Sequence, residues 1–412
     1  MTGALLQLVA KGVQMEHLIG NASSSYFHSV YRRRINFAIE TVELYFRGNP
    51  DFGNKVDVEL SDCPGDMLSS CGIAIDLPEV NFTTEGGWVN DIGHLLIKEI
   101  SFEIGGRCID KHFGVWMSIW NALTLPAEKK IAYNNLIGNV SVLTGTSLRL
   151  LQTSPIPKRR IYVPLQFWFN KNVSLAFPLL ALQTDTSVNA GAKFVIQFEK
   201  ANKLLRGDPI NVNSLHLGDV RFSADNIFLS KKERLWFTKE DFEITITQLQ
   251  LCSSTVKGRI QNTLLNSLNH PILELIWVFR DTDIENATGL SKSYIKFTDS
   301  DNGNPVDQAY LRINGIKRQK ERRGAYYNKV TTLNTHTRSP DSSGILVMPF
   351  CTKPESFYEY TGSLNLTGLD DVVLTSILKP TASSKTNRLM IFARNYNILK
   401  FHDGFARLKY KI

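Results

Sequence analysis

The sequence has few cysteines, and none of them form the C-x-x-C spacing that marks many zinc and redox sites. The five cysteines are scattered along the chain: Cys63, Cys71, Cys108, Cys252 and Cys351. An odd number of widely spaced cysteines favours reduced thiols with structural roles. We therefore expect no disulfide framework.

Long apolar runs are also missing. No stretch reaches the roughly 18 to 20 consecutive apolar residues that a membrane-spanning helix needs, and the first residues lack the cationic start and apolar core of a secretory signal. With 43% hydrophobic and 21% charged residues, the composition is typical of folded globular proteins. A chain of 412 residues suits two domains of about 200 residues each.

Catalytic motifs are absent as well: there is no G-x-x-x-x-G-K-[ST] phosphate loop, G-x-S-x-G elbow or H-E-x-x-H zinc helix. Gly105 and Gly106 follow a predicted strand but lack the third glycine and the helix of a dinucleotide site. The best metal candidates flank one strand and its turn, namely His94, Cys108, Asp110 and His112. Only the last two are closely spaced, whereas zinc sites usually include a tight ligand pair. We expect a structural turn, no cofactor and no enzymatic activity.

Positive charge is concentrated in the second half of the chain. Residues 1–200 carry 18 basic and 18 acidic residues, whereas 201–412 carry 29 and 21. One candidate contact loop is strongly basic, with Glu321 as its only acid: Lys317, Arg318, Lys320, Arg322 and Arg323. Such a loop can contact nucleic acid or phospholipid headgroups, remain solvated, or contact another subunit. It lacks the interleaved aromatic residues of a strand-binding groove, so we expect no sequence-specific nucleic-acid binding.

Alternation of apolar and polar residues is the commonest pattern. It occurs at 100–104, 194–198 and 242–246, and each case predicts a strand with one buried face. Helical patterns are few, at 113–123 and near the N-terminus. Many short strands separated by Gly, Asn, Asp and Pro predict an all-β protein of antiparallel sandwiches.

The two halves contain similar elements in the same order. The segment 33–44 resembles 238–251, "ISFEIGGR" resembles "AYLRINGIKR", "IYVPLQFWF" resembles "ILVMPF", and "KFVIQFEK" resembles "RLMIFARNYNILKF". This order predicts a duplicated β-domain. We predict an N-terminal arm at 1–23, a first domain at 24–200, a linker at 201–217, where alternation lapses, and a second domain at 218–412.

The most apolar segment is 161–183, "IYVPLQFWFNKNVSLAFPLLALQ". We predict two late strands of the first domain with a turn at 170–172. The prolines Pro164 and Pro178 should mark strand ends, edges or bends, because proline cannot donate to a ladder. The aromatic residues could form the core of the domain or the contact between domains: Phe167, Trp168, Phe169 and Phe177.

Several stretches together resemble the major capsid proteins of nucleocytoplasmic large DNA viruses. Residues 8–40 are similar to the opening of that family, which includes a Phe-x-x-x-Tyr-Arg-Arg strand; the matching residues are Phe27, Tyr31, Arg32 and Arg33. Residues 63–78 and 88–124 resemble its Gly-Asp-Leu strand and its "GH.LI…IGGQ.ID…W..IW" run. The matching residues here are Gly65, Asp66, Gly93, His94, Gly105, Gly106, Asp110, Trp116 and Trp120.

The resemblance continues through the rest of the chain. Segment 161–183 is similar to the family's "IPLPFWF…ALPLIALQ", matched at Pro164, Phe167, Trp168, Phe169 and Pro178. "LRINGIKRQKERRGAYYNKV" and "FARNYNILKFHDGFARLKY" follow in order, with matches at Asn314, Gly315, Asn395, Tyr396 and Asn397. The family's "NFSRID" stretch is replaced by "YTGSLNLTGLDD" at 360–371, which is a departure.

The resemblance implies a double jelly roll, that is, two tandem eight-stranded antiparallel sandwiches with few short helices. It further implies a homotrimer that forms a pseudo-hexagonal capsomer of an icosahedral virion, assembled in the host cytoplasm. Neighbouring capsomers, minor capsid proteins and, through the N-terminal arm, an internal membrane are the implied partners. The alternatives are a minor capsid protein, a transient assembly scaffold of the same fold, a carbohydrate-binding attachment module, or a cupin-like metal enzyme.

Overall fold

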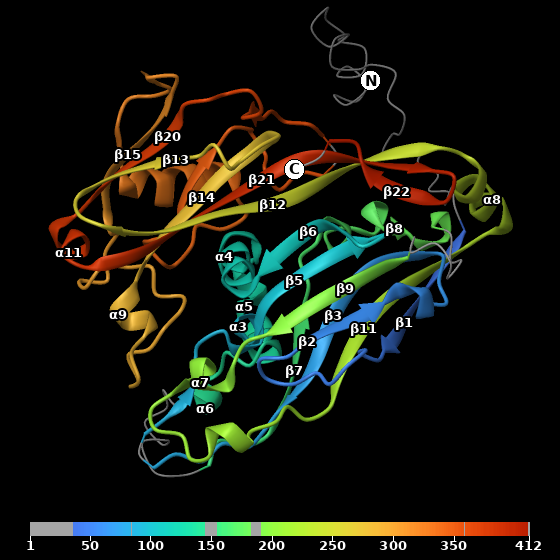
Figure 1. Ribbon diagram of the computed structural model, residues 1–412, viewed down its shortest axis with the longest axis horizontal. Helices are drawn as coiled ribbons and strands as arrows, with labels where there is room; N and C mark the ends of the chain where they lie inside the picture. Colours follow the sequence, from blue (N-terminus) through green and yellow to red (C-terminus); the bar gives the residue numbers. More distant parts are fainter. Residues whose placement is uncertain (1–35, 84, 145–154, 183–190, 358, 411–412) are drawn as a thin grey trace, which may run out of the picture. The chain divides into compact units, whose positions relative to one another are not determined.

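The computed structural model describes residues 36–83, 85–144, 155–182, 191–357 and 359–410 (Figure 1). The chain divides into two units, Met1–Phe37 and Ala38–Ile412. The second unit contains two β-sandwiches, and all strand pairs in them are antiparallel. Within the described residues, no helix is both long enough and apolar enough to cross a membrane.

The first sandwich consists of two sheets. One has the strand order β1-β11-β3-β7, formed by Phe37–Leu44, Val220–Leu229, Met67–Leu77 and Arg159–Pro164, and β8 (Phe177–Pro178) pairs with β3. The other has the order β2-β9-β5-β6, formed by Lys55–Glu59, Ala192–Phe198, Ile97–Ile104 and Arg107–Phe113. Side chains from both sheets share one hydrophobic core.

The second sandwich is built in the same way. Its first sheet has the order β12-β21-β14-β18, formed by Phe242–Lys257, Thr386–His402, Pro271–Asp281 and Leu346–Pro349; β19 (Leu364–Asn365) and β22 (Phe405–Leu408) extend it. Its second sheet has the order β13-β20-β15-β16, formed by Ile260–Leu264, Val372–Leu378, Val306–Ile313 and Ile316–Lys317, and β17 (Arg322–Arg323) pairs with β15.

The strand order is identical in the two sandwiches. When only the strands of these four orders are counted along the chain, strands one, eight, three and six of each sandwich form one sheet, and strands two, seven, four and five form the other. The two-residue strand β16 is then the fifth strand of the second sandwich. This strand order is the jelly-roll order of two Greek keys. The prediction of two tandem eight-stranded jelly rolls is therefore confirmed.

Short helices lie in the connections between strands. They are α3 (Ile92–Leu96), α4 (Gly114–Thr124), α5 (Lys130–Leu136), α6 (Ser141–Thr144), α7 (Ala201–Leu204), α8 (Lys231–Lys239), α9 (Thr282–Glu285), α10 (Thr331–Thr335) and α11 (Pro380–Ser383). A short π-helix, η7 (Tyr326–Val330), precedes α10, and the short strands β4 (Gly87–Trp88) and β10 (Leu205–Arg206) pair with each other. The helix predicted at 113–123 is thus confirmed as α4.

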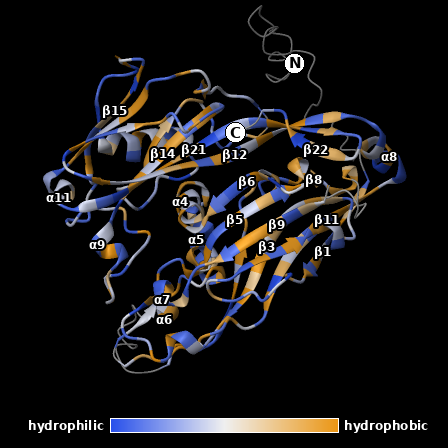
Figure 2. Cartoon of the chain, viewed as in Figure 1, coloured by the Kyte–Doolittle hydropathy of each residue, from blue (hydrophilic) through white to orange (hydrophobic). Residues whose placement is uncertain are grey.

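Alternating side chains build the strands, as predicted. In β5, Ile100, Phe102 and Ile104 are buried in the first core, whereas Glu99 and Glu103 are partly exposed. Hydrophobic residues accordingly mark strands such as β3, β9 and β14 in Figure 2, whereas α8 is mainly hydrophilic. Because one face of each such strand is apolar, burial of that face fixes the register of pairing.

Equivalent tight turns join the fourth and fifth strands of each sandwich. Gly105 and Gly106 have φ values of 56° and 72°, and Asn314 and Gly315 have 47° and 79°. Two successive residues at positive φ are typical of the two-residue hairpin turn that suits the twist of antiparallel strands, and Gly and Asn adopt this conformation with little strain. The predicted resemblance between "IGGR" and "INGI" therefore has a structural basis.

The predicted domain boundary differs from the strand pairing. Strand β11 (Val220–Leu229) pairs with β3 along Val220–Ile227, so it belongs to the first sandwich rather than to a second domain starting at 218. The chain passes to the second sandwich through α8. One predicted repeat pairing is wrong for the same reason. "KFVIQFEK" is β9, whose topological equivalent is β20, and "RLMIFARNYNILKF" is β21, whose equivalent is β11. The glycine and asparagines at 207–213 lie in a connection within the first sandwich.

The apolar segment 161–183 also differs in part. It contains β7, but the second predicted strand is reduced to the two residues of β8. Between them lie the 3₁₀ turns Trp168–Asn170 and Val173–Leu175, and the Asn172 side chain accepts a hydrogen bond from the Ser174 N–H at 2.9 Å. Pro164 ends β7, and Pro178 ends β8, as the prolines suggested.

Two equivalent glycines should be intolerant of substitution. Gly114 and Gly324 each follow the fifth strand of a sandwich or its extension, and a methyl group would collide with the carbonyl oxygens of His94 and Ile97 or of Val306. Gly114→Ala and Gly324→Ala should each lower the unfolding free energy by about 1–3 kcal/mol, measured by thermal or denaturant unfolding. Gly289→Ala, which meets no atom within 4 Å, is the control. Equal effects for all three variants would contradict the prediction.

Candidate functional site: the junction between the two sandwiches

Helix α4 joins the first sandwich to the outer face of the second. Buried Met117 belongs to the first core, whereas four other buried side chains of the helix form a stripe that faces the second sandwich, namely Trp116, Ile119, Trp120 and Leu123. They pack with residues from the β12-β21-β14-β18 sheet, namely Leu249, Ile276, Val278, Val347, Met390 and Phe392. The ring centroids of Trp116 and Phe392 lie 5.3 Å apart. A third hydrophobic cluster therefore lies between the two sandwich cores, and it contains both tryptophans of the family's "W..IW" motif, Trp116 and Trp120.

Two long strands strengthen this junction. The N-terminal part of β12 and the C-terminal part of β21 leave the second core and enter the first, where Ile246, Leu399 and Phe401 are buried. Phe401 lies 5.9 Å from Phe177, measured between ring centroids, and stacks on Phe242 at 4.6 Å. The first core thus includes side chains from the end of the chain.

The aromatic residues of segment 161–183 lie in this first core. All four are at most 3% exposed: Phe167, Trp168, Phe169 and Phe177. Each of them lies within 6.5 Å of Phe102, measured between ring centroids. Of the two interpretations left open by the sequence, the structure supports the core, and Trp168 additionally reaches the junction.

Polar contacts fix the register of the two sandwiches. The Oδ1 atom of Asp110 in β6 accepts a hydrogen bond from the Leu249 N–H of β12 at 3.0 Å, and the Gln248 amide donates to the Ile109 carbonyl. The Gln248 Oε1 atom accepts from the side chains of Asn397 at 2.8 Å and Asn395 at 3.4 Å. Three family-motif residues, Asp110, Asn395 and Asn397, thereby converge on one buried point.

The neighbouring polar residues are closely packed. His112 stacks on Phe167 at 4.4 Å, and its Nε2 atom lies 3.1 Å from Asp110 Oδ2. Partly buried Lys171 lies 5.3 Å above the Trp120 ring, and desolvation together with the nearby Arg394 charge holds the pKa of Lys171 well below its ordinary value. The cavity among these side chains measures about 10 Å³, whereas ligand pockets measure about 300 to 1,000 Å³. This part of the junction is a packed contact and has no room for a substrate.

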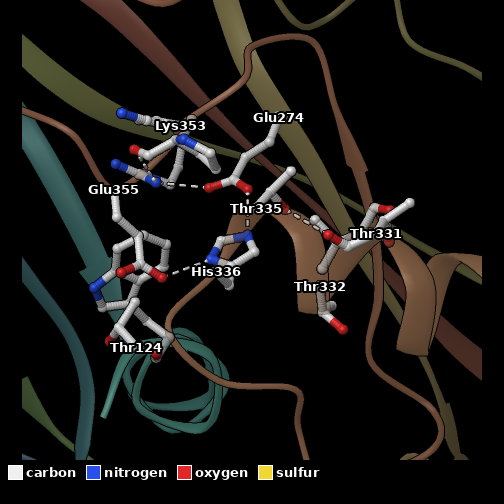
Figure 3. Close-up of polar contacts among 12 residues, drawn as sticks. Thr124, Glu274, Thr331, Thr332, Thr335, His336, Lys353 and Glu355 are labelled. Atoms are coloured by element: carbon white, nitrogen blue, oxygen red, sulfur yellow. Dashed lines mark hydrogen bonds and ion pairs between the residues drawn. The ribbon is translucent and has the colours of Figure 1, made fainter. Parts of the chain in front are cut away.

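A buried cluster of charges lies next to α4 (Figure 3). Glu274 in β14 is fully buried; its Oε1 atom accepts from Arg394 Nη1 at 2.6 Å, and its Oε2 atom lies 2.9 Å from His336 Nε2. The other ring nitrogen of His336 lies 3.0 Å from Glu355 Oε1. The Arg394 guanidinium lies 4.1 Å above the Trp120 ring. The cluster therefore ties β14, β21, the end of α10 and the loop around 355 to the junction helix.

Mutual attraction outweighs burial in this cluster. Burial alone would raise the pKa of Glu274, but the charges of His336 and Arg394 have the larger effect and lower the pKa to about 2. Burial alone would lower the pKa of His336, but the Glu274 carboxylate has the larger effect and raises the pKa to about 9. At neutral pH the cluster holds two cations and two carboxylates, each with a partner. Sequence reasoning missed these residues, although lone charges within the apolar runs of β14 and β21 were a signal for them.

Other predicted residues have structural roles. Asp66 accepts from the Leu229 N–H at 2.8 Å and pairs with Arg234 at 3.1 Å, and Gly65 allows close approach of Asn226. Gly93 in α3 packs against the carbonyl oxygen of Ile137. Phe27, Tyr31, Arg32 and Arg33 lie outside the described residues.

The metal candidates do not converge. His94 Nδ1 and Nε2 lie 3.2 Å from Ser118 Oγ and 2.9 Å from Tyr133 Oη, and burial lowers the pKa of His94 to about 3. Cys108 is exposed, and its thiol lies 3.6 Å from the Asp110 carbonyl oxygen. His94 is thus occupied in a separate hydrogen-bond network, away from the Asp110–His112 pair.

The basic loop lies on an exposed edge of the second sandwich. Its exposed residues are Lys317, Arg318, Lys320, Arg322 and Arg323. Lys317 lies 4.5 Å above Tyr310, and Arg322 lies 5.2 Å above Tyr326. These aromatic contacts orient the cations at the surface.

Two jelly rolls locked together by a packed junction define the class of double jelly-roll structural proteins. Comparison with family models agrees: "Major capsid protein N-terminus" matches residues 25–230, and "Large eukaryotic DNA virus major capsid protein" matches residues 233–407. The chain belongs to the major capsid proteins of large eukaryotic DNA viruses. It is a structural protein of the capsid and not an enzyme. The two matches meet near α8, where the structure passes between sandwiches.

Individual relatives extend over the whole chain. The major capsid protein of Pyramimonas orientalis virus is 31% identical, and that of Phaeocystis pouchetii virus is 29% identical, each with 100% of both chains covered. Among solved structures, a chain of the quasi-atomic model of the PBCV-1 virus capsid has a TM-score of 0.78 at 25% identity, covering 94% of this chain and 100% of that one.

Removing the charge of Glu274 should be strongly destabilising. Glu274→Gln would leave buried Arg394 and His336 without their shared counter-charge, and the unfolding free energy should fall by about 3–5 kcal/mol in denaturant unfolding. Asp341→Asn removes a mainly exposed carboxylate that pairs with Lys130 at 2.6 Å, and it should cost about 0–1 kcal/mol. A Glu274→Gln variant as stable as Asp341→Asn would contradict this assignment.

The charge cluster should make stability fall in alkaline solution. The pKa of His336 rises from 6.5 to about 9 on folding, so its stabilisation is complete below pH 6.5 and is lost as the pH passes through 9. The thermal midpoint should therefore fall between about pH 7 and pH 10, and His336→Asn should weaken this dependence. His402→Asn, at an exposed histidine, should preserve it. Parallel pH profiles for wild type and His336→Asn would refute the role of His336.

Proposed function

We propose that three copies of this chain form a pseudo-hexagonal capsomer and that such capsomers tile an icosahedral shell. The observation that carries the proposal is the identical strand order of two sandwiches fixed together by one junction. Each chain presents two similar blocks, so a ring of three chains presents six. The likeness to the PBCV-1 virus capsid chain supports this arrangement.

The proposed partners follow from that role. Neighbouring capsomers contact the outer sides of the ring, and minor capsid proteins contact its inner face. The N-terminal arm, residues 1–23, lies on that inner face near an internal membrane, and assembly takes place in the host cytoplasm. No sequence-specific nucleic-acid binding is involved, because a tiling protein acts through shape and buried area.

Two alternatives make different predictions. A transient scaffold would be missing from purified mature particles, and a minor capsid protein would be scarce in them, whereas a principal coat protein would dominate their protein mass. An attachment module would use a pocket of about 400 Å³ lined in part by Tyr360, Tyr396 and Tyr410, since aromatic faces suit sugar rings. A glycan array without binding would count against that alternative.

The purified chain should be a stable trimer. Three chains of 46.5 kDa give a mass of roughly 140 kDa, measurable by light scattering at micromolar concentration. A monodisperse monomer under these conditions would refute the trimeric capsomer.

A further inference from the structure

The junction within the chain has a simple plan that could be repeated between chains. The outer face of the β12-β21-β14-β18 sheet packs against one edge of the first sandwich. That edge consists of the fifth strand, β6, and the helix that follows it, α4. Because the two sandwiches have the same strand order, the second sandwich carries an equivalent edge, and the first carries an equivalent face.

The equivalent edge, here called the free edge, consists of β16, β17 and the helical segment Tyr326–Thr335. A tightly packed glycine lies at the start of the helical segment in both cases: Gly114 is the first residue of α4, and Gly324 lies two residues before η7. The stripe on α4 is at most 7% exposed. On the free edge, by contrast, Ile316 is 75%, Val330 45% and Leu333 74% exposed. The helical segment of the free edge thus exposes apolar side chains three residues apart, Val330 and Leu333, whereas the equivalent stripe on α4 is buried.

The equivalent face, here called the free face, is the outer side of the β1-β11-β3-β7 sheet. It also exposes large apolar side chains: Ile39 is 49%, Tyr45 74% and Tyr162 46% exposed. The face is continuous, since Arg221 of β11 lies 4.1 Å above Tyr45 and Arg160 of β7 lies 5.8 Å above Tyr162. The corresponding face of the second sandwich is buried under α4.

The two free surfaces carry opposite charge. The free face has four carboxylates, Glu43, Asp76, Asp219 and Asp225, against Arg160 and Arg221, which leaves an excess of two negative charges. The basic loop of the free edge has five cations against Glu321, which leaves an excess of four positive charges. Complementary charge of this kind selects the partner and its orientation.

We propose that the free face of one copy packs against the free edge of the next copy, repeating between chains the junction found within the chain. The contact is head-to-tail, because a face on one copy meets an edge on the next. Two copies joined in this way still have one free face and one free edge unpaired, and a third copy pairs with both and closes the ring. This inference rests on the proposed trimer and names the surfaces that form it. The basic loop is then a subunit contact.

Variants at exposed side chains test the proposal without disturbing the fold. Leu333→Asp on the free edge and Tyr45→Lys on the free face should each weaken the trimer at least about tenfold, because each places a like charge against the partner surface. Leu333→Lys should weaken it less than Leu333→Asp, because lysine faces an acidic surface. Ile260→Asp, at a side chain 61% exposed on β13, is the control and should remain trimeric. Thermal midpoints near the wild-type value confirm that the variants are folded.

A photo-crosslinking amino acid at position 333 locates the partner surface directly. In the wild-type background, mass spectrometry should find crosslinks between chains to the free face, that is, to 37–45, 67–77, 159–164 or 219–229. Crosslinks only to other segments would overturn the proposal. Trimers that persist in Leu333→Asp would also overturn it while leaving the proposed function intact. A wild-type chain that is itself monomeric would instead refute the proposed function.

Discussion

The structure depends on one contact, the packing of α4 against the outer face of the β12-β21-β14-β18 sheet. This sheet is covered on both sides, by its own sandwich core and by the junction cluster. Strand β14 is consequently apolar from Ile272 to Phe279 except at Glu274, and β21 is apolar from Leu389 to Ala393, in the way that strand segments buried on both faces usually are. An antiparallel jelly roll normally exposes one face of each sheet to solvent, whereas here the outer face of the β12-β21-β14-β18 sheet is buried against α4.

The charged residues follow from the same double burial. A sheet without an exposed face has no solvent to receive a carboxylate, so Glu274 is stable only with Arg394 and His336 beside it. Removing one member of such a cluster is strongly destabilising, because it leaves the remaining charge buried without a partner. Placed between α10, the loop at 355 and Trp120, the cluster permits one arrangement of the connections behind the junction.

Much of the fold could be predicted because alternation and turn residues are local properties. The strands at 100–104, 194–198 and 242–246, helix α4 and the paired hairpin turns were all visible in the sequence. The sequence places β11 in the wrong domain. Its partner, β3, lies about 150 residues earlier, and the residue pattern around β11 contains no information about so distant a pairing. The Gln248 contacts and the Glu274 cluster depend likewise on residues more than 60 positions apart, so single charges in apolar runs could suggest them without identifying their partners.

The long strands β12 and β21 have a consequence for synthesis. Domains of a growing chain generally fold in order, with the N-terminal one first. In this protein, however, Leu399 and Phe401 belong to the core of the first sandwich. A chain still attached to the ribosome can therefore pair the early strands but cannot complete that core until β21 has been made. Completion of both sandwich cores therefore depends on one and the same strand, β21.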